Sequence, residues 1–258
     1  MKRLTTILLI NLGIIAGAVN AARGQGAPIP EELTETISGI EAAANDRDLD
    51  ELLDYYSEDF TNTDGLTTAT LAKAVEQMWQ EYPELTYTTE IESWSREGDE
   101  LVAETKTTIE GMNAEANTRQ LSSTIKSRQY FQDRELVRQE ILAEQSRLSS
   151  GVNPPQVNII APNSVETGEK YNFDLIVDEP LGDRVLLGAV QEEKTAGNLY
   201  LNPIELELEL LPAGGIYKVA TAPLLPDSNW LSAILVRGDG ITRITHRVNV
   251  VESSQSEN

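Results

Sequence analysis

The sequence contains no cysteine and only one histidine, His246. The absence of cysteine excludes disulfides, thiolate metal sites and cysteine nucleophiles. A single histidine excludes metal sites built from several histidines, and it confines any histidine general base to the surroundings of residue 246. The sequence also lacks a nucleophile elbow, a P-loop and a dinucleotide-binding fingerprint. We therefore expect neither a metal site nor a cofactor, and we expect His246 at the surface or at an interface.

Basic residues are also scarce relative to acidic ones. The chain has 20 Lys and Arg residues against 42 Asp and Glu residues, which gives a net charge of −22. A charge of this sign repels nucleic-acid phosphates and anionic lipids. Binding to nucleic acid is therefore disfavoured, whereas cationic partners remain open.

The first residues have the pattern of an export signal. Lys2 and Arg3 precede an apolar run from Leu4 to Ala18, and small residues follow up to Ala21. The run is shorter than the roughly 20 apolar residues that span a membrane. We expect a signal peptide at residues 1–21, an unstructured leader at 22–30, a periplasmic or secreted protein, and no stable membrane insertion after cleavage.

The spacing at which hydrophobic residues recur changes along the chain. Residues 31–81 have helical spacing in three segments, with Tyr56 in the stripe of the second helix and Phe60 at its end. From Glu84 to about residue 147 the period is two, which indicates a four-stranded antiparallel meander. The order predicts an α+β domain at residues 31–150, with three helices on a curved antiparallel sheet.

The pattern of the remaining residues predicts a linker followed by strands. Small polar residues and two prolines beginning at Ser149 predict a linker, placed at residues 151–156. Seven short alternating strands within residues 157–251, one of them at 204–210, predict an all-β sandwich domain. Residues 252–258 form a polar tail.

Residues 42–64, AAANDRDLDELLDYYSEDFTNTD, resemble the nuclear transport factor 2-like superfamily, which includes SnoaL-like polyketide cyclases and ketosteroid isomerases. The resemblance covers about residues 31–147 and implies a cone-shaped domain that often encloses a pocket between its sheet and its helices. The C-terminal half is similar to bacterial immunoglobulin-like sandwiches, although it lacks their paired cysteines. Fold alone does not decide function in this superfamily.

The resemblance places Asp64 where isomerase-type members have their general base. Ile40 stands where their oxyanion-binding tyrosine is expected, and residues 31–147 contain no histidine. Alternatively, Asp64 stabilises the turn at residues 63–65 through its side chain. A buried Asp64 beside a tyrosine hydroxyl would favour an enzyme, and a turn position beside a filled cone would count against one.

Aromatic side chains give two interpretations. They could line a pocket for a small apolar ligand, or they could simply pack in the core. Trp94 is in the opposite strand phase from Ile91, so we expect it to face another surface or the second domain. The candidate ligand-binding residues are Tyr56, Phe60, Trp79, Trp94 and Tyr130.

Three charged patterns also have simple structural explanations. Lys126 and Arg128 could bind an anion, but we expect a lattice of cross-strand ion pairs. Asp46, Asp48 and Asp50 are a poor match to the start of a calcium loop, and helix capping by Asp48 explains them better. The glutamates at 205, 207 and 209 are expected to protect an edge strand.

Three functions remain open from the sequence. The first is a non-catalytic module that binds an unknown protein or a small apolar ligand. The second is an isomerase- or cyclase-type enzyme that uses Asp64 as general base. The third is a homodimeric structural scaffold.

Overall fold

The computed structural model describes residues 28–113, 119–202, 205–211 and 214–253. The expected signal peptide, all but residues 28–30 of the expected leader, and residues 254–258 of the expected tail lie outside these ranges. Within the described residues, no helix is long and apolar enough to cross a membrane.

Three α-helices form, as the sequence predicted: α1 (Glu31–Asp46), α2 (Leu49–Asp54) and α3 (Thr68–Glu81). Asp48 caps α2 by accepting a hydrogen bond from the backbone N–H of Glu51, so the capping interpretation is confirmed. A capping box between Thr67 and Thr70 begins α3.

The predicted helical position of Tyr56 and Phe60 is wrong. Helix α2 ends at Asp54, and Tyr56–Asn62 form strand β1, which pairs in parallel with the start of β5 (Glu135–Gly151). Tyr56, Phe60 and Asn62 are buried on one face of this strand. Residues four apart share a face in a strand as well as in a helix, so the spacing of the two rings did not distinguish the two structures.

The antiparallel meander is present over its full predicted length. Its strands are β2 (Glu84–Glu97), β3 (Glu100–Asn113), β4 (Arg119–Gln132) and β5. Helix α1 covers the edge strand β2. The side-chain amide of Asn45 donates to the backbone carbonyl of Tyr87, and its oxygen accepts from the Tyr87 N–H. Glu41 accepts from the N–H of Thr89, so three backbone groups of this edge are occupied by side chains of α1.

The C-terminal residues form strands and one short 3₁₀ helix, η1 (Gly197–Leu199). The strands are β6 (Val157–Ile160), β7 (Ser164–Glu166), β8 (Lys170–Val177), β9 (Leu187–Lys194), β10 (Glu209–Leu210), β11 (Gly215–Thr221), β12 (Asp227–Arg237) and β13 (Gly240–Val251). Of the described residues of the strand predicted at 204–210, only Glu209 and Leu210 are in a strand. Glu205, Glu207 and Glu209 are exposed, and β10 lies at one edge of the sheet.

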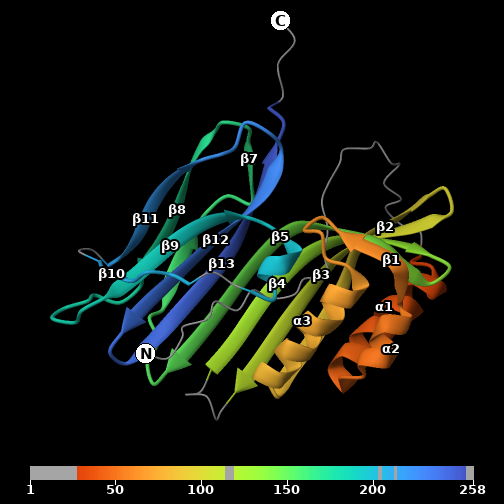
Figure 1. Ribbon diagram of the computed structural model, residues 1–258, viewed down its shortest axis with the longest axis horizontal. Helices are drawn as coiled ribbons and strands as arrows, with labels where there is room; N and C mark the ends of the chain where they lie inside the picture. The colour runs from red at the N-terminus through yellow and green to blue at the C-terminus, as the bar shows by residue number, and fades with distance from the viewer. Residues whose placement is uncertain (1–27, 114–118, 203–204, 212–213, 254–258) are drawn as a thin grey trace, which may run out of the picture.

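One ten-stranded sheet joins the two halves of the chain. Its order is β10-β9-β12-β13-β5-β4-β3-β2, with β1 beside β5 and β7 beside β13. Residues from Gln145 to Gly151 of β5 pair with β13, so Ser149 and Ser150, expected to begin the linker, are paired strand residues. Strands β11, β8 and β6 form a second sheet (Figure 1).

The two hydrophobic cores lie on opposite faces of the large sheet. Trp230 belongs to the core beneath the three helices, whereas its neighbour Leu231 belongs to the core against the three-stranded sheet. Successive residues of a strand point to opposite faces. Strand β12 therefore contributes to both cores, and the first core contains residues from both halves of the chain.

Candidate functional site

A fully buried ion pair joins the two halves of the chain. The guanidinium of Arg247 on β13 binds both carboxylate oxygens of Asp64, which follows β1. The Nη1–Oδ1 distance is 2.9 Å and the Nη2–Oδ2 distance is 2.6 Å. Both side chains have a relative accessibility of 0%. This parallel bidentate geometry is the strongest form of an arginine–carboxylate contact.

Glu144 on β5 adds a second carboxylate to this cluster. Its Oε2 accepts from the Nε of Arg247 at 3.2 Å and from the indole N–H of Trp230 at 2.8 Å. Ser228 accepts a further hydrogen bond from Arg247. The arginine is therefore held from three directions by residues that lie far apart in sequence.

The segment around η1 covers Asp64. The hydroxyl of Tyr200 donates to Asp64 Oδ2 at 2.6 Å, and the N–H of Gly197 donates to the Asp64 carbonyl, also at 2.6 Å. The Tyr200 ring meets Trp230 edge to face at 5.2 Å. Leu199 and Leu201 pack against the core beneath the helices. This part of the C-terminal half therefore completes the N-terminal core.

Asn62, rather than Asp64, stabilises the turn. Its Oδ1 accepts from the backbone N–H groups of Asp64 and Leu66. The side chain of Asp64 is occupied instead by Arg247 and Tyr200. The expected turn role of the Asp64 side chain is therefore wrong, because its partners are supplied by residues that follow it by more than 130 positions.

Opposing electrostatic effects act on the two carboxyl groups. Burial by itself raises the pKa of Asp64, but the charge and hydrogen bonds of Arg247 outweigh it and hold the pKa below its ordinary value. Burial raises the pKa of Glu144, and the Arg247 charge only partly opposes it. Burial and the neighbouring Asp64 raise the pKa of the Tyr200 hydroxyl. These shifts favour the ionised form of Asp64 beside Arg247 and the protonated forms of Glu144 and Tyr200.

This arrangement suits Asp64 poorly to abstract a proton. A general base needs a free lone pair, access to the substrate and a pKa near the working pH. Asp64 does lie beside a tyrosine hydroxyl, the feature expected for an enzyme. However, that hydroxyl comes from the C-terminal half, and Arg247 occupies both carboxylate oxygens.

The candidate aromatic residues do not form one pocket. Tyr56 and Phe60 meet edge to face at 5.0 Å within the core, and Trp79 packs against it. A register shift between Ile91 and Ser93 turns Trp94 toward the same core, so its expected opposite orientation is wrong. Tyr130 is not part of this core. Its hydroxyl donates to Glu140, and the guanidinium of Arg138 lies 3.4 Å from its ring centroid.

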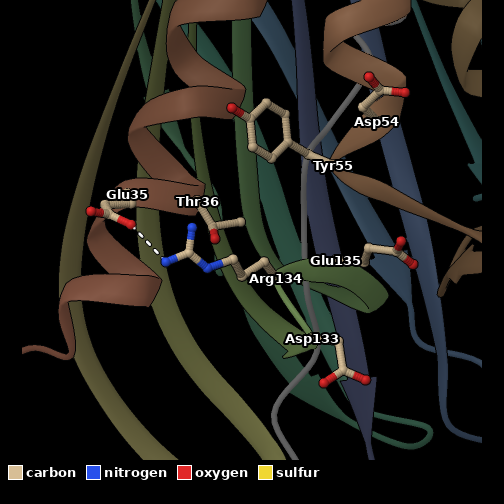
Figure 2. A pocket seen from close by; sticks show the side chains of 7 residues that line it. All are labelled: Glu35, Thr36, Asp54, Tyr55, Asp133, Arg134 and Glu135. Carbon is tan, nitrogen blue, oxygen red and sulfur yellow. Dashed lines mark hydrogen bonds and ion pairs between the residues drawn. The ribbon is translucent and has the colours of Figure 1, made fainter.

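A pocket of about 230 Å³ lies outside this core, between the helices and the β4–β5 turn. Figure 2 shows Arg134 paired with Glu35 across it. Its lining is mostly acidic: Glu35, Thr36, Asp54, Tyr55, Asp133, Arg134 and Glu135. None of the aromatic residues predicted to bind a ligand lies in it.

The cross-strand lattice on the meander is confirmed. Lys126 pairs with Glu92, and Arg128 pairs with Glu104 and Glu140. His246, in contrast, is not at the surface. It lies near Phe173 between the two sheets, and its Nε2 is 2.9 Å from the Pro162 carbonyl oxygen. Burial lowers its pKa and favours the neutral ring.

Sequence reasoning missed five of the six residues whose side chains form this cluster: Glu144, Tyr200, Ser228, Trp230 and Arg247. Their local patterns are ordinary strand or loop patterns. One available signal was Arg247, a charged residue between the apolar residues Ile244 and Val248 of a predicted strand. A charge in such a strand requires a buried counter-charge.

Comparisons with known proteins identify the first half. Residues 39–138 match the SnoaL-like domain family and form a SnoaL-like domain. Residues 152–251 match a domain of unknown function, DUF8623. No curated protein matches the sequence.

Three solved structures show the range of similar proteins. Bd1075 of Bdellovibrio bacteriovorus is 15% identical over 43% of this chain and 39% of its own, with a TM-score of 0.32. AclR of Streptomyces galilaeus, a putative hydroxylase, is 19% identical over 43% of this chain and 77% of its own, with a TM-score of 0.35. A putative SnoaL-like polyketide cyclase of Shewanella putrefaciens is 13% identical over 44% of this chain and 90% of its own, with a TM-score of 0.33. The chain thus spans well under half of the Bdellovibrio protein.

Proposed function

We propose that this chain is a non-catalytic binding protein whose SnoaL-like domain acts as a structural unit. The observation that carries the proposal is the bidentate contact between Arg247 and Asp64. The best candidate for a general base is neutralised by an arginine and covered by Tyr200. Its role is to hold the two halves together.

A protein partner suits this chain better than a small apolar ligand. Tyr56 and Phe60 fill the core together with residues of the C-terminal half, including Tyr200 and Trp230. The outer surface remains available for contact, and its excess of acidic residues favours a partner with a basic face.

The proposal includes export and a two-part organisation. Export depends on the residue pattern at 1–21, and mass spectrometry of the mature chain should find Ala22 at its N-terminus. We also propose that residues 157–251 are an immunoglobulin-like sandwich that displays or positions the SnoaL-like domain. Support comes from the two sheets that enclose the second core.

An assay of proton transfer tests the absence of catalysis. The mature protein is incubated with 3-cyclohexenone, and formation of the conjugated ketone is followed by ultraviolet absorbance. We expect the rate with protein to equal the rate in buffer. A rate enhancement that disappears in Asp64→Asn while the fold is retained would support the enzyme instead.

The enzyme and the homodimer remain the alternatives. The contact between the Tyr200 hydroxyl and Asp64 favours the enzyme, but catalysis would require Arg247 to leave the carboxylate. A homodimer through the outer face of the meander would cover ion pairs such as Lys126–Glu92. Native mass spectrometry distinguishes a doubled mass from a bound protein of a different mass.

A further inference from the structure

Arg243 on β13 is an arginine without a counter-charge. It makes no hydrogen bond or ion pair with the described residues, although it is partly buried. The other partly or fully buried arginines of β4, β5, β12 and β13 all have partners. Examples are Arg147 with the Val157 carbonyl and Arg237 with Asp239. A chain with 42 acidic residues thus leaves one enclosed guanidinium unpaired within its described part.

A second cation lies on the same face of the sheet. Arg243 is opposite Leu148, which is opposite Leu121 on β4. Arg119 is two residues from Leu121, and alternate residues of a strand share a face. Burial lowers the pKa of Arg243, and the charge of Arg119 lowers it further, as expected for two neighbouring guanidinium groups.

The end of α3 adds a hydrogen-bond donor. Tyr82 follows α3 and is completely buried, and its hydroxyl has no hydrogen-bond partner among the described residues. Tyr82 directly follows Glu81, whose carboxylate pairs with Arg119, so it lies at the same part of the sheet as the two arginines. The electrostatic influence of Arg243 on the Tyr82 hydroxyl agrees with this placement. A buried hydroxyl without a partner costs stability unless another molecule supplies an acceptor.

The surrounding protein does not neutralise this cluster. Glu81 at the end of α3 is paired with Arg119. The C-terminus of α3 attracts cations, but it carries only a partial negative charge. One full positive charge therefore remains among the described groups.

We infer that Arg243, Arg119 and Tyr82 form a binding site for an oxyanion of the phosphate class. Two guanidinium groups offer several donors in a planar arrangement that suits tetrahedral oxyanions. The Arg119 side chain is 38% exposed, so an anion can enter from solvent. The site shares no residue with the Asp64 cluster. The inference therefore does not depend on the proposal that the protein is non-catalytic.

Thermal unfolding of the mature chain tests the site. Sodium phosphate is titrated against sodium chloride at constant ionic strength. We expect phosphate to raise the Tm of the wild type in a saturable manner, because a ligand that binds the folded state stabilises it. Arg243→Met should lose this rise. Arg184→Gln is the matched control, since Arg184 is a half-exposed arginine paired with Glu179, and it should respond as the wild type does.

The stability without phosphate gives a second readout. Arg243→Met should then be at least as stable as the wild type, because it removes an enclosed unpaired charge. Glycerol 3-phosphate in place of phosphate distinguishes a phosphomonoester site from a site for the free anion, and either result supports the inference. No saturable rise in the wild type, an equal rise in Arg243→Met, or strong destabilisation by Arg243→Met without phosphate would each overturn it.

Discussion

Arg247 and Asp64 are 183 residues apart in sequence, and they form a bidentate ion pair whose side chains are inaccessible to solvent. The contact connects the last strand of the C-terminal half to the turn that follows β1. It places a guanidinium where the family resemblance predicts a catalytic base. The Asp64 carboxylate, which could otherwise accept a proton, is bound at both oxygens by Arg247.

Breaking this pair should destabilise the fold strongly. Arg247→Met leaves Asp64 and Glu144 buried without their cation, which costs about 3–5 kcal/mol for a buried pair. Urea unfolding followed by tryptophan fluorescence measures the change. Arg96→Met is the matched control, because Arg96 forms an exposed pair with Glu32 and its loss should cost less than ~1 kcal/mol. Equal costs for the two variants would contradict the structural role of Arg247.

The stability of the protein should depend on the ionisation of Glu144. The pKa of Glu144 is raised from 4.5 in the folded state, so its stabilising contribution is complete below pH 4.5 and is lost as the pH rises through the folded pKa. Glu144→Gln imitates the protonated form and keeps an oxygen for Trp230 and Arg247. The variant should therefore gain stability relative to the wild type on going from pH 4 to pH 7, measured by urea unfolding at both values.

Asp64 should have the opposite dependence. The pKa of Asp64 is lowered from 3.8, so its contribution is present above that pH and is lost as the pH falls below it. Asp64→Asn should consequently be most destabilising near neutral pH and less so in acid. If both substitutions showed the same pH trend, the assigned protonation states would be incorrect.

The SnoaL-like half should not fold by itself. A chain of residues 28–151 lacks Leu199, Tyr200, Leu201 and Trp230, which complete its core. It also lacks Arg247, so two buried carboxyl groups lose their partner. We expect broad, poorly dispersed amide signals in a proton–nitrogen NMR spectrum of this fragment. A dispersed spectrum and a cooperative unfolding transition would show instead that the first half is autonomous.

Asn45 should protect the sheet against self-association. Asn45→Ala frees the backbone N–H and carbonyl of Tyr87 on the edge strand β2. Exposed edge groups pair readily with another chain. We expect a loss of about 1–2 kcal/mol in stability and a concentration-dependent rise in mass by light scattering. Asn158→Ala, on an exposed face of β6, is the control and should leave the mass unchanged.

Local features of the fold were predictable from sequence because their causes are local. Asp48 caps the helix that begins beside it, and β3 and β4 pair without a register shift. Local irregularities were not predictable, since the register shift near Trp94 changes which face its side chain occupies. The sequence singled out Asp64 but could not identify its partner. A single sequence does not show which of the chain's buried charges are neighbours after folding.

The shared strand β5 also affects the order in which the protein can form. Its second part pairs with β13, which emerges during synthesis much later than β4 and β1. Non-local strand pairing is slow because the intervening chain must first be brought together. Before β13 is synthesised, residues 145–151 of β5 have unpaired backbone groups along the edge that β13 later occupies. The carboxyl groups of Asp64 and Glu144 also lack Arg247, with which they pair in the folded protein. The nascent chain is therefore vulnerable to misassembly and proteolysis in the interval before β13 is released.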